Sequence, residues 1–78
     1  MDNIKVGEIW KHYKTGGQYM IINFGILQVK DAQLDEKECV IYQNILDQKI
    51  WIRPVEDFLE IVDSKDMAQQ KRRFQKVN

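Results

Sequence analysis

Two short segments of the chain combine aromatic rings with cationic side chains. His12, Tyr13 and Lys14 are consecutive, and Trp51 lies two residues before Arg53. Aromatic rings stack on nucleobases or pack on prolines, and a guanidinium forms paired hydrogen bonds with a carboxylate or a phosphate. Because strand ends can cluster in a small β fold, the functional interpretation of these segments is an aromatic and cationic binding patch. The candidate ligand-binding residues are His12, Tyr13, Lys14, Tyr19, Trp51 and Arg53.

A structural role is the competing interpretation of the same residues. Tryptophan supplies a large apolar area to a small core, which favours packing for Trp10 and Trp51. Arg53 then forms an internal ion pair with Glu56 or Glu60, which follow it closely in the chain. The sequence leaves both interpretations open, because it does not show whether these side chains are exposed.

The residue types offer little support for catalysis or metal binding. The chain has one cysteine and one histidine, Cys39 and His12, in different segments. A cysteine nucleophile needs a histidine partner, and the usual zinc sites need four ligands. The acidic run 31–38 lacks the glycine and the spacing of a calcium-binding loop. We therefore predict no catalytic residues, no metal and no cofactor, with His12 a half-exposed hydrogen-bonding residue and Cys39 a packing residue.

The length and composition of the chain limit what it can be. With 78 residues, of which 44% are hydrophobic and 31% charged, it is one small globular domain rather than a disordered segment. No apolar run approaches the length that spans a membrane, and the first residues do not read as a signal peptide. A secreted domain of this size usually carries several cysteines. The single cysteine therefore predicts a cytoplasmic protein without membrane contact.

Charge is distributed unevenly although the net charge is zero. Residues 1–30 carry +2, residues 31–63 carry −6 and residues 64–78 carry +4. A basic segment can contact the phosphates of a nucleic acid or fold back on an acidic part of its own chain. Both interpretations stay open here, the second being favoured. The basic residues that would meet phosphate are Lys71, Arg72, Arg73 and Lys76.

The pattern along the chain predicts strands joined by tight turns. Residues 18–29 alternate, with Tyr19 and Ile21 on one face and Ile22 and Phe24 on the other, and Gly25 is expected to mark a bulge. Proline at position 54 ends a strand and begins a helical turn. The predicted strands are 7–13, 18–29, 38–46, 49–53 and 58–62, with turns at 14–17 and 47–48, a polar loop at 30–37 and a helical turn at 54–57.

Five short strands in so few residues predict an all-β protein, namely a small five-stranded SH3-like barrel. The barrel domain is expected to comprise residues 1–62, with the helical turn before its last strand. Residues 63–78 are expected to form a basic C-terminal extension, either a short helix or a tail that docks on the barrel through Phe74.

Several motifs together resemble a known family. Trp10-Lys11-His12-Tyr13-Lys14, Val40-Ile41-Tyr42 and Trp51-Ile52-Arg53-Pro54 occur in that order, followed by Phe58-x-Glu60. This pattern resembles a bacterial family catalogued as domain of unknown function 1653, over residues 7–62. The resemblance implies an SH3-like barrel but no activity. Family members usually carry a His-Thr/Ser-Glu stretch after the second strand, whereas residues 26–34 contain no histidine here.

Three function classes follow from these observations. The favoured class is a non-catalytic binding module for a protein or peptide, because small barrels often present an aromatic-lined groove. The second class is a nucleic-acid (RNA) binding module, which the basic C-terminal segment supports and the neutral net charge disfavours. The third and least favoured class is an enzyme or enzyme subunit, which would need a buried ionisable pair in a concave pocket.

Overall fold

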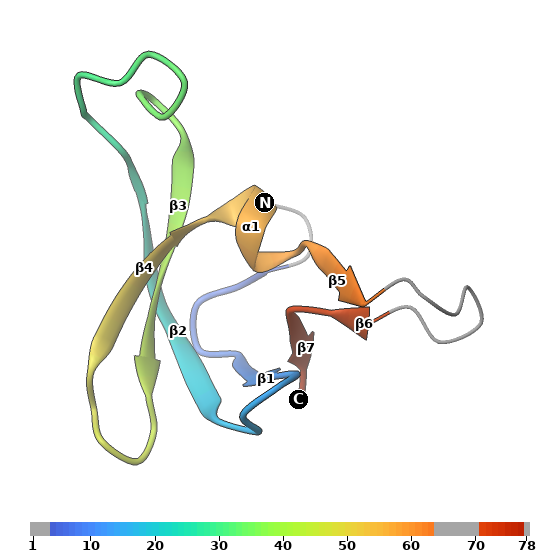
Figure 1. Cartoon of the computed structure of the whole chain (residues 1–78). Coiled ribbons are helices and arrows are strands. Elements are labelled where there is room, and N and C mark those ends of the chain that lie inside the picture. Colours follow the sequence, from blue (N-terminus) through green and yellow to red (C-terminus); the bar gives the residue numbers. More distant parts are fainter. Residues whose placement is uncertain (1–3, 64–70, 78) are drawn as a thin grey trace.

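The described part of the chain is mostly β structure with one short helix (Figure 1). The computed structural model describes residues 4–63 and 71–77. The elements are β1 (Ile9–His12), β2 (Gln18–Ile26), β3 (Glu38–Asn44), β4 (Ile50–Pro54), α1 (Val55–Phe58), β5 (Ile61–Asp63), β6 (Lys71–Arg72) and β7 (Phe74–Lys76).

Five antiparallel strands form one sheet, which confirms the predicted β class, but the sheet is open, so the predicted five-stranded barrel is not formed. The strand order is β4-β3-β2-β1-β7, and β5 pairs with β6 in a separate two-stranded sheet. A barrel would require the two outer strands, β4 and β7, to pair with each other. Among the described elements they do not, and β4 and β7 remain the two edges of the sheet.

The fifth strand of the sheet is not the one that the sequence predicts. Residues 58–62 were expected to be a strand, but Phe58 ends α1 and only Ile61–Asp63 is extended. Pro54 precedes the helix, as expected, and the helix buries Val55 and Phe58 on one side. The fifth position in the sheet is taken by β7, which pairs with β1.

The C-terminal residues belong to the folded structure. The register of β7 on β1 places Phe74 opposite His12, and Phe74 is buried. In the expected extension, Asp63 ends β5 and residues 71–77 are mainly extended, so neither described part is helical. The division of the chain at residues 62 and 63 stays a prediction, since residues 64–70 lie outside the described part.

A bulge lies in the middle of β2, three residues earlier than predicted. Ile21 pairs with Tyr42 and Asn23 pairs with Ile41, which leaves Ile22 as the extra residue. An extra residue reverses the alternation beyond it, because successive side chains in a strand point to opposite faces. Phe24 therefore shares a face with Ile21, against the predicted alternation, and packs against the core.

The turns differ in detail from those predicted. The first strand is shorter than 7–13 because Gly7 has a φ of +93°, which is incompatible with an extended strand. The turn after β3 contains five residues, 45–49, rather than two. Asn44 Oδ1 accepts hydrogen bonds from the N–H groups of Leu46 and Asp47, at 2.8 and 3.1 Å. This side-chain cap ends the strand at Asn44, two residues early.

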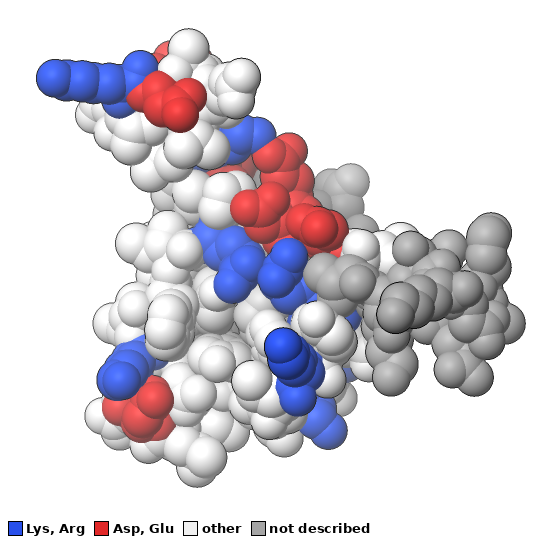
Figure 2. Space-filling view, in the orientation of Figure 1, with Lys and Arg blue, Asp and Glu red and all other residues white. Residues whose placement is uncertain are grey.

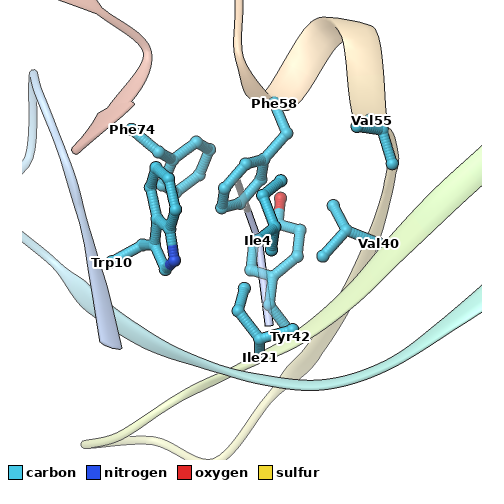
Figure 3. Close-up of a cluster of buried hydrophobic side chains, with 8 residues drawn as sticks. All are labelled: Ile4, Trp10, Ile21, Val40, Tyr42, Val55, Phe58 and Phe74. Carbon is cyan, nitrogen blue, oxygen red and sulfur yellow. The ribbon is translucent and has the colours of Figure 1, made fainter. Parts of the chain in front are cut away.

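The core is a cluster of aromatic rings between the sheet, α1 and the N-terminal segment (Figure 3). Phe58 and Phe74 stack with ring centroids 4.1 Å apart, and Trp10 and Tyr42 meet Phe58 edge-on at 5.4 and 5.3 Å. Such ring pairs add to the stabilisation that burial of their area supplies. The buried members of the cluster are Ile4, Trp10, Ile21, Val40, Tyr42, Val55, Phe58 and Phe74.

Cys39 is buried and unpaired, which confirms the prediction of a packing residue. Its thiol lies 3.8 Å from the carbonyl oxygen of Lys37. In the described part of the chain, the one helix is far too short and polar to cross a membrane.

Candidate functional site

Four of the six predicted ligand-binding residues lie on the face of the sheet that covers the core. Trp51 is directly opposite Tyr42 in the β3–β4 ladder, and His12 is opposite Phe74 in the β1–β7 ladder. Residues directly opposite each other project from the same face of a sheet. The predicted residues on this face are His12, Tyr19, Trp51 and Arg53.

Arg53 lies at the centre of the arrangement. Its Nε donates a hydrogen bond to the Tyr42 hydroxyl at 3.2 Å, and its Cζ lies 5.9 Å from the centroid of the Phe74 ring. These contacts hold the guanidinium against aromatic rings, at a distance where a cation and a ring attract each other. The side chain is half-buried.

The predicted ion pair of Arg53 with Glu56 or Glu60 is wrong. Glu56 pairs with Lys37, and Glu60 pairs with Arg73 at 3.6 Å. Glu56 lies in α1 and Glu60 follows it, whereas Lys37 directly precedes β3 and Arg73 lies between β6 and β7. Within residues 4–63 and 71–77, no carboxylate forms a salt bridge with Arg53. Its guanidinium is a half-buried cation whose neighbours are aromatic.

His12 is half-buried and hydrogen-bonded, as predicted. Its Nδ1 accepts hydrogen bonds from the N–H groups of Lys14 and Thr15 at 3.2 and 3.4 Å, and its ring meets Phe74 edge-on at 5.0 Å. Burial lowers the pKa of His12, and the nearby cations Arg53, Arg73 and Lys14 lower it further. Three cations therefore disfavour the protonated form of His12, at the end of β1.

The other predicted residues are divided between core and surface. Tyr19 packs edge-on against Tyr42 and Phe74, at 5.3 and 5.7 Å between centroids. Tyr13 is 41% exposed and lies beside His12, with 5.2 Å between the ring centroids. Among the described residues, no ring contact joins Tyr13 to Trp51, so the two exposed rings do not form one stacked pair.

The edge strand β4 carries a row of exposed apolar side chains, which we call the open edge. Ile50, Trp51 and Ile52 are 58%, 48% and 64% exposed, whereas Trp10 is buried. The packing interpretation thus holds for Trp10 and not for Trp51. Uncharged surface covers most of β4 in Figure 2, with basic groups near both of its ends and acidic groups gathered over α1.

The backbone of the open edge also has free hydrogen-bonding groups. Asn44 donates to the carbonyl of Lys49 at 2.9 Å, which marks them as a hydrogen-bonded pair of the ladder. Hydrogen-bonded and non-bonded pairs alternate along an antiparallel ladder. The N–H and C=O groups of Trp51 and Arg53 therefore point toward β3, and those of Ile50 and Ile52 point away from the sheet.

The two isoleucines of the open edge were not among the predicted site residues. One signal was available in the sequence, because Pro54 cannot donate to a ladder and proline in a sheet is confined to edges, bulges and strand ends. Pro54 lies opposite Cys39, at a position whose N–H would point outward. The proline thus marks β4 as an edge strand, and Ile50 and Ile52 follow as the residues whose backbone groups point outward. The alternation of apolar and polar side chains alone does not identify this edge.

Two hollows on the surface of the described residues lie near the predicted site residues. One hollow of about 180 Å³ lies at the predicted segment 12–14 and is lined by Lys11, His12, Tyr13 and Gln75. A second hollow, of about 350 Å³, lies between residues 36–38 and the start of α1, and most of the residues that line it are charged. No group of three or more histidine, cysteine or acidic side chains within the described ranges is arranged to hold a metal ion.

Comparison with known proteins gives one match. No curated protein and no solved structure matches the chain at a significant level. The model of one family matches residues 8–76, and so includes β7 as well as the motifs at residues 10–14 and 51–54. Because the match covers most of the chain, the protein belongs to the family described as protein of unknown function (DUF1653).

Proposed function

We propose that the chain is a non-catalytic binding module, and that it binds a protein or peptide partner as an added strand along β4. The observation that carries the proposal is the open edge, where three consecutive apolar side chains are exposed beside unpaired backbone groups. Addition of a strand to a sheet edge is a recurrent mode of peptide recognition. Backbone hydrogen bonds supply affinity, and the alternate side chains supply specificity.

The exposure of this edge supports a partner more than a purely structural role. Proteins usually protect edge strands with charges, bulges or covering loops, because a bare edge pairs with other chains. Here β4 begins with the three apolar residues Ile50, Trp51 and Ile52, and its protective features, the charge of Arg53 and the proline at position 54, both lie at its end. An added strand would satisfy the outward backbone groups and cover the three apolar side chains.

A peptide-display selection tests the proposal. The probe is a library of random twelve-residue peptides, selected on the wild-type protein. The discriminating variant is Ile52→Pro, because it removes an outward N–H and leaves the ladder bonds between β3 and β4 intact. Ile52→Val is the matched control, since it keeps the N–H and nearly the same side chain.

We expect the selected peptides to bind wild type and Ile52→Val alike, and to bind Ile52→Pro at least about 10-fold more weakly. Circular dichroism and urea unfolding establish that both variants fold. Peptides that bind the folded Ile52→Pro variant as tightly as wild type would contradict strand addition at β4. The same holds if the selection enriches no peptide.

Binding of RNA is a second candidate, favoured by one specific observation. His12 and Arg53 lie against the same Phe74 ring, at 5.0 and 5.9 Å from its centroid, and besides burial the cations Arg53, Arg73 and Lys14 lower the pKa of His12. A cluster of cations is the electrostatic requirement for phosphate contact, and exposed Tyr13 offers a ring for stacking. Titration with short RNA at two salt concentrations distinguishes the candidates, because phosphate contacts weaken steeply with salt. Amide shifts at residues 12–17 and 71–76 that vanish at high salt would favour RNA.

A further inference from the structure

We propose that the partner strand carries a carboxylate that binds Arg53, followed by three apolar residues that face the rest of the open edge. This inference rests on the proposed function and specifies its ligand. It follows from the positions that Trp51 and Arg53 occupy in the ladder, from the lack of an acidic partner for Arg53, and from the residues that flank β4.

The ladder determines which side chains of a partner would approach β4 most closely. An antiparallel partner would exchange hydrogen bonds with Ile50 and Ile52, whose N–H and C=O groups point outward. Trp51 and Arg53 would then occupy non-hydrogen-bonded pairs, where opposite side chains are nearest each other. Recognition by side chains is therefore concentrated at Trp51 and Arg53, on the core face of the sheet.

Arg53 is prepared to receive an anion. Its Nε is held by the Tyr42 hydroxyl and its guanidinium lies over Phe74, so its position is fixed before a ligand arrives. No carboxylate of the described residues neutralises it. A half-buried cation without a counter-charge is costly, and a carboxylate placed opposite it would offset that cost with charge-assisted hydrogen bonds.

The neighbouring acidic residues do not remove this attraction. Glu56 and Glu60, which follow Arg53 on and after α1, are already paired with Lys37 and Arg73. The two glutamates that follow Arg53 most closely in the chain therefore each have a cation of their own, and neither occupies the place of a partner carboxylate at Arg53.

A second copy of this chain fits the open edge poorly. Antiparallel self-pairing centred on Trp51 would place Lys49 opposite Arg53, and like charges directly opposite destabilise a sheet. Centring the pair on Ile52 would place Pro54 opposite Ile50, and proline has no N–H to donate. Centring it on Ile50 would pair Ile52 with Gln48, which has a φ of +64° and is not extended. A heterologous strand avoids all three defects.

The order of residues in the partner follows from an antiparallel alignment. The residue opposite Arg53 comes first and is acidic, and the next faces Ile52 and is apolar. The third residue faces Trp51 and is aromatic or aliphatic, and the fourth faces Ile50 and is apolar. A strand that reads acidic, apolar, aromatic, apolar is therefore the expected ligand, with its acidic and aromatic side chains on the same face.

Four synthetic peptides and two protein variants test the inference. The probe peptide is Ser-Thr-Glu-Val-Tyr-Val-Thr-Ser. One control replaces Glu by Gln, another exchanges Glu with the following Val so that the carboxylate moves to the other face, and a third replaces Tyr by Ser. The protein variants are Arg53→Gln and, as the matched control, Lys11→Gln, which removes an exposed cation from β1 on the outer face. Affinities are measured by isothermal titration calorimetry.

We expect the change of Glu to Gln to weaken binding to wild type and to Lys11→Gln about 10-fold, and to change binding to Arg53→Gln less than about 2-fold. Exchange of Glu and Val should weaken binding similarly, and replacement of Tyr should weaken it on all three proteins. This pattern measures the interaction between Arg53 and the peptide carboxylate separately from the other contacts. A merely structural role of Arg53 would lower affinity for all four peptides equally.

Other outcomes overturn the inference in distinguishable ways. If the Glu and Gln peptides bind the wild-type protein equally and neither binds Ile52→Pro, the carboxylate is not recognised, but strand addition at β4 still holds. No binding of the Glu peptide at millimolar concentration overturns the inference, while the display selection separately decides the proposed function. A wild-type protein that sediments as a dimer, and an Ile52→Pro variant that sediments as a monomer, would assign the edge to a second copy.

Discussion

Apolar side chains are buried in the ring cluster around Phe58 and Phe74 but exposed along strand β4. Around Phe58 and Phe74 every ring is covered by another ring, and Phe58 has no exposed surface. Along β4, the apolar side chains from Ile50 to Ile52 are about half exposed or more. Both regions lie on strands or a helix of ordinary geometry. The difference indicates that the buried ring cluster supplies most of the stability and that the exposed side chains of the open edge contribute little to it.

The largest expected effect on stability distinguishes the buried ring of Phe58 from the exposed ring of Trp51. Phe58→Ala removes a buried ring that contacts Trp10, Tyr42 and Phe74, and should lower the free energy of unfolding by about 3–5 kcal/mol. Because a domain of this size has only a few kcal/mol of stability, the variant should be largely unfolded. Trp51→Ala should cost less than about 1 kcal/mol. Urea unfolding measures both, and equal losses would remove the contrast between the regions.

A smaller effect is expected where the two regions meet. Tyr42→Phe keeps the buried ring but removes the hydroxyl that accepts the hydrogen bond from Arg53. The loss should be about 1 kcal/mol in the free energy of unfolding. The same change made in an Arg53→Gln background should cost less, because the hydrogen bond is already absent. Additive losses in the double variant would show that Arg53 and Tyr42 act independently.

The titration of His12 offers a pH-dependent test. The folded pKa of His12 lies below the ordinary histidine value of 6.5, because burial and nearby cations disfavour the charged imidazole. The unfolded chain therefore binds the proton more readily than the folded protein does. The stabilisation is present above the unfolded pKa and is lost as the pH falls below it toward the folded pKa.

Thermal unfolding between about pH 7.5 and pH 5.5 measures this dependence. His12 is the only histidine in the chain, so no other imidazole contributes in that range. His12→Asn keeps an acceptor near the position of Nδ1 and should flatten the profile. An unchanged slope in the variant would mean that other groups produce it.

The smallest effect is expected at the open edge. Ile52→Thr replaces an exposed apolar side chain by another β-branched one, and should change the free energy of unfolding by less than about 0.5 kcal/mol. The unfolding curve should overlay that of the wild type. A loss comparable to that of Tyr42→Phe would indicate that the edge is covered in solution.

Much of the sheet could be predicted from the sequence, and the exceptions have physical causes. The cores of β2, β3 and β4 follow from runs of β-branched and aromatic residues. The strand β7 could not be predicted, because its neighbours Gln75 and Lys76 are polar and only Phe74 indicates a buried position. The role of Phe58 was ambiguous, since its spacing from Val55 fits one face of a helix as well as the start of a strand.

The candidate site was predictable in its residue types and not in its arrangement. His12, Tyr19 and Arg53 meet around Phe74, a residue that reaches them through the pairing of β7 with β1. No local pattern indicates that long-range pairing. The bulge at Ile22 was equally hidden, because both faces of β2 are apolar there and either register satisfies the alternation.

Hydrogen exchange at the amides of β4 tests most directly whether this strand is an open binding edge. In the free protein, the amides of Trp51 and Arg53 should be protected by their bonds to β3, and those of Ile50 and Ile52 should exchange close to the rate of an unstructured peptide. Addition of the Glu-containing peptide should protect Ile50 and Ile52. Protection of these two amides in the free protein, or no gain on adding a peptide that binds, would contradict the account.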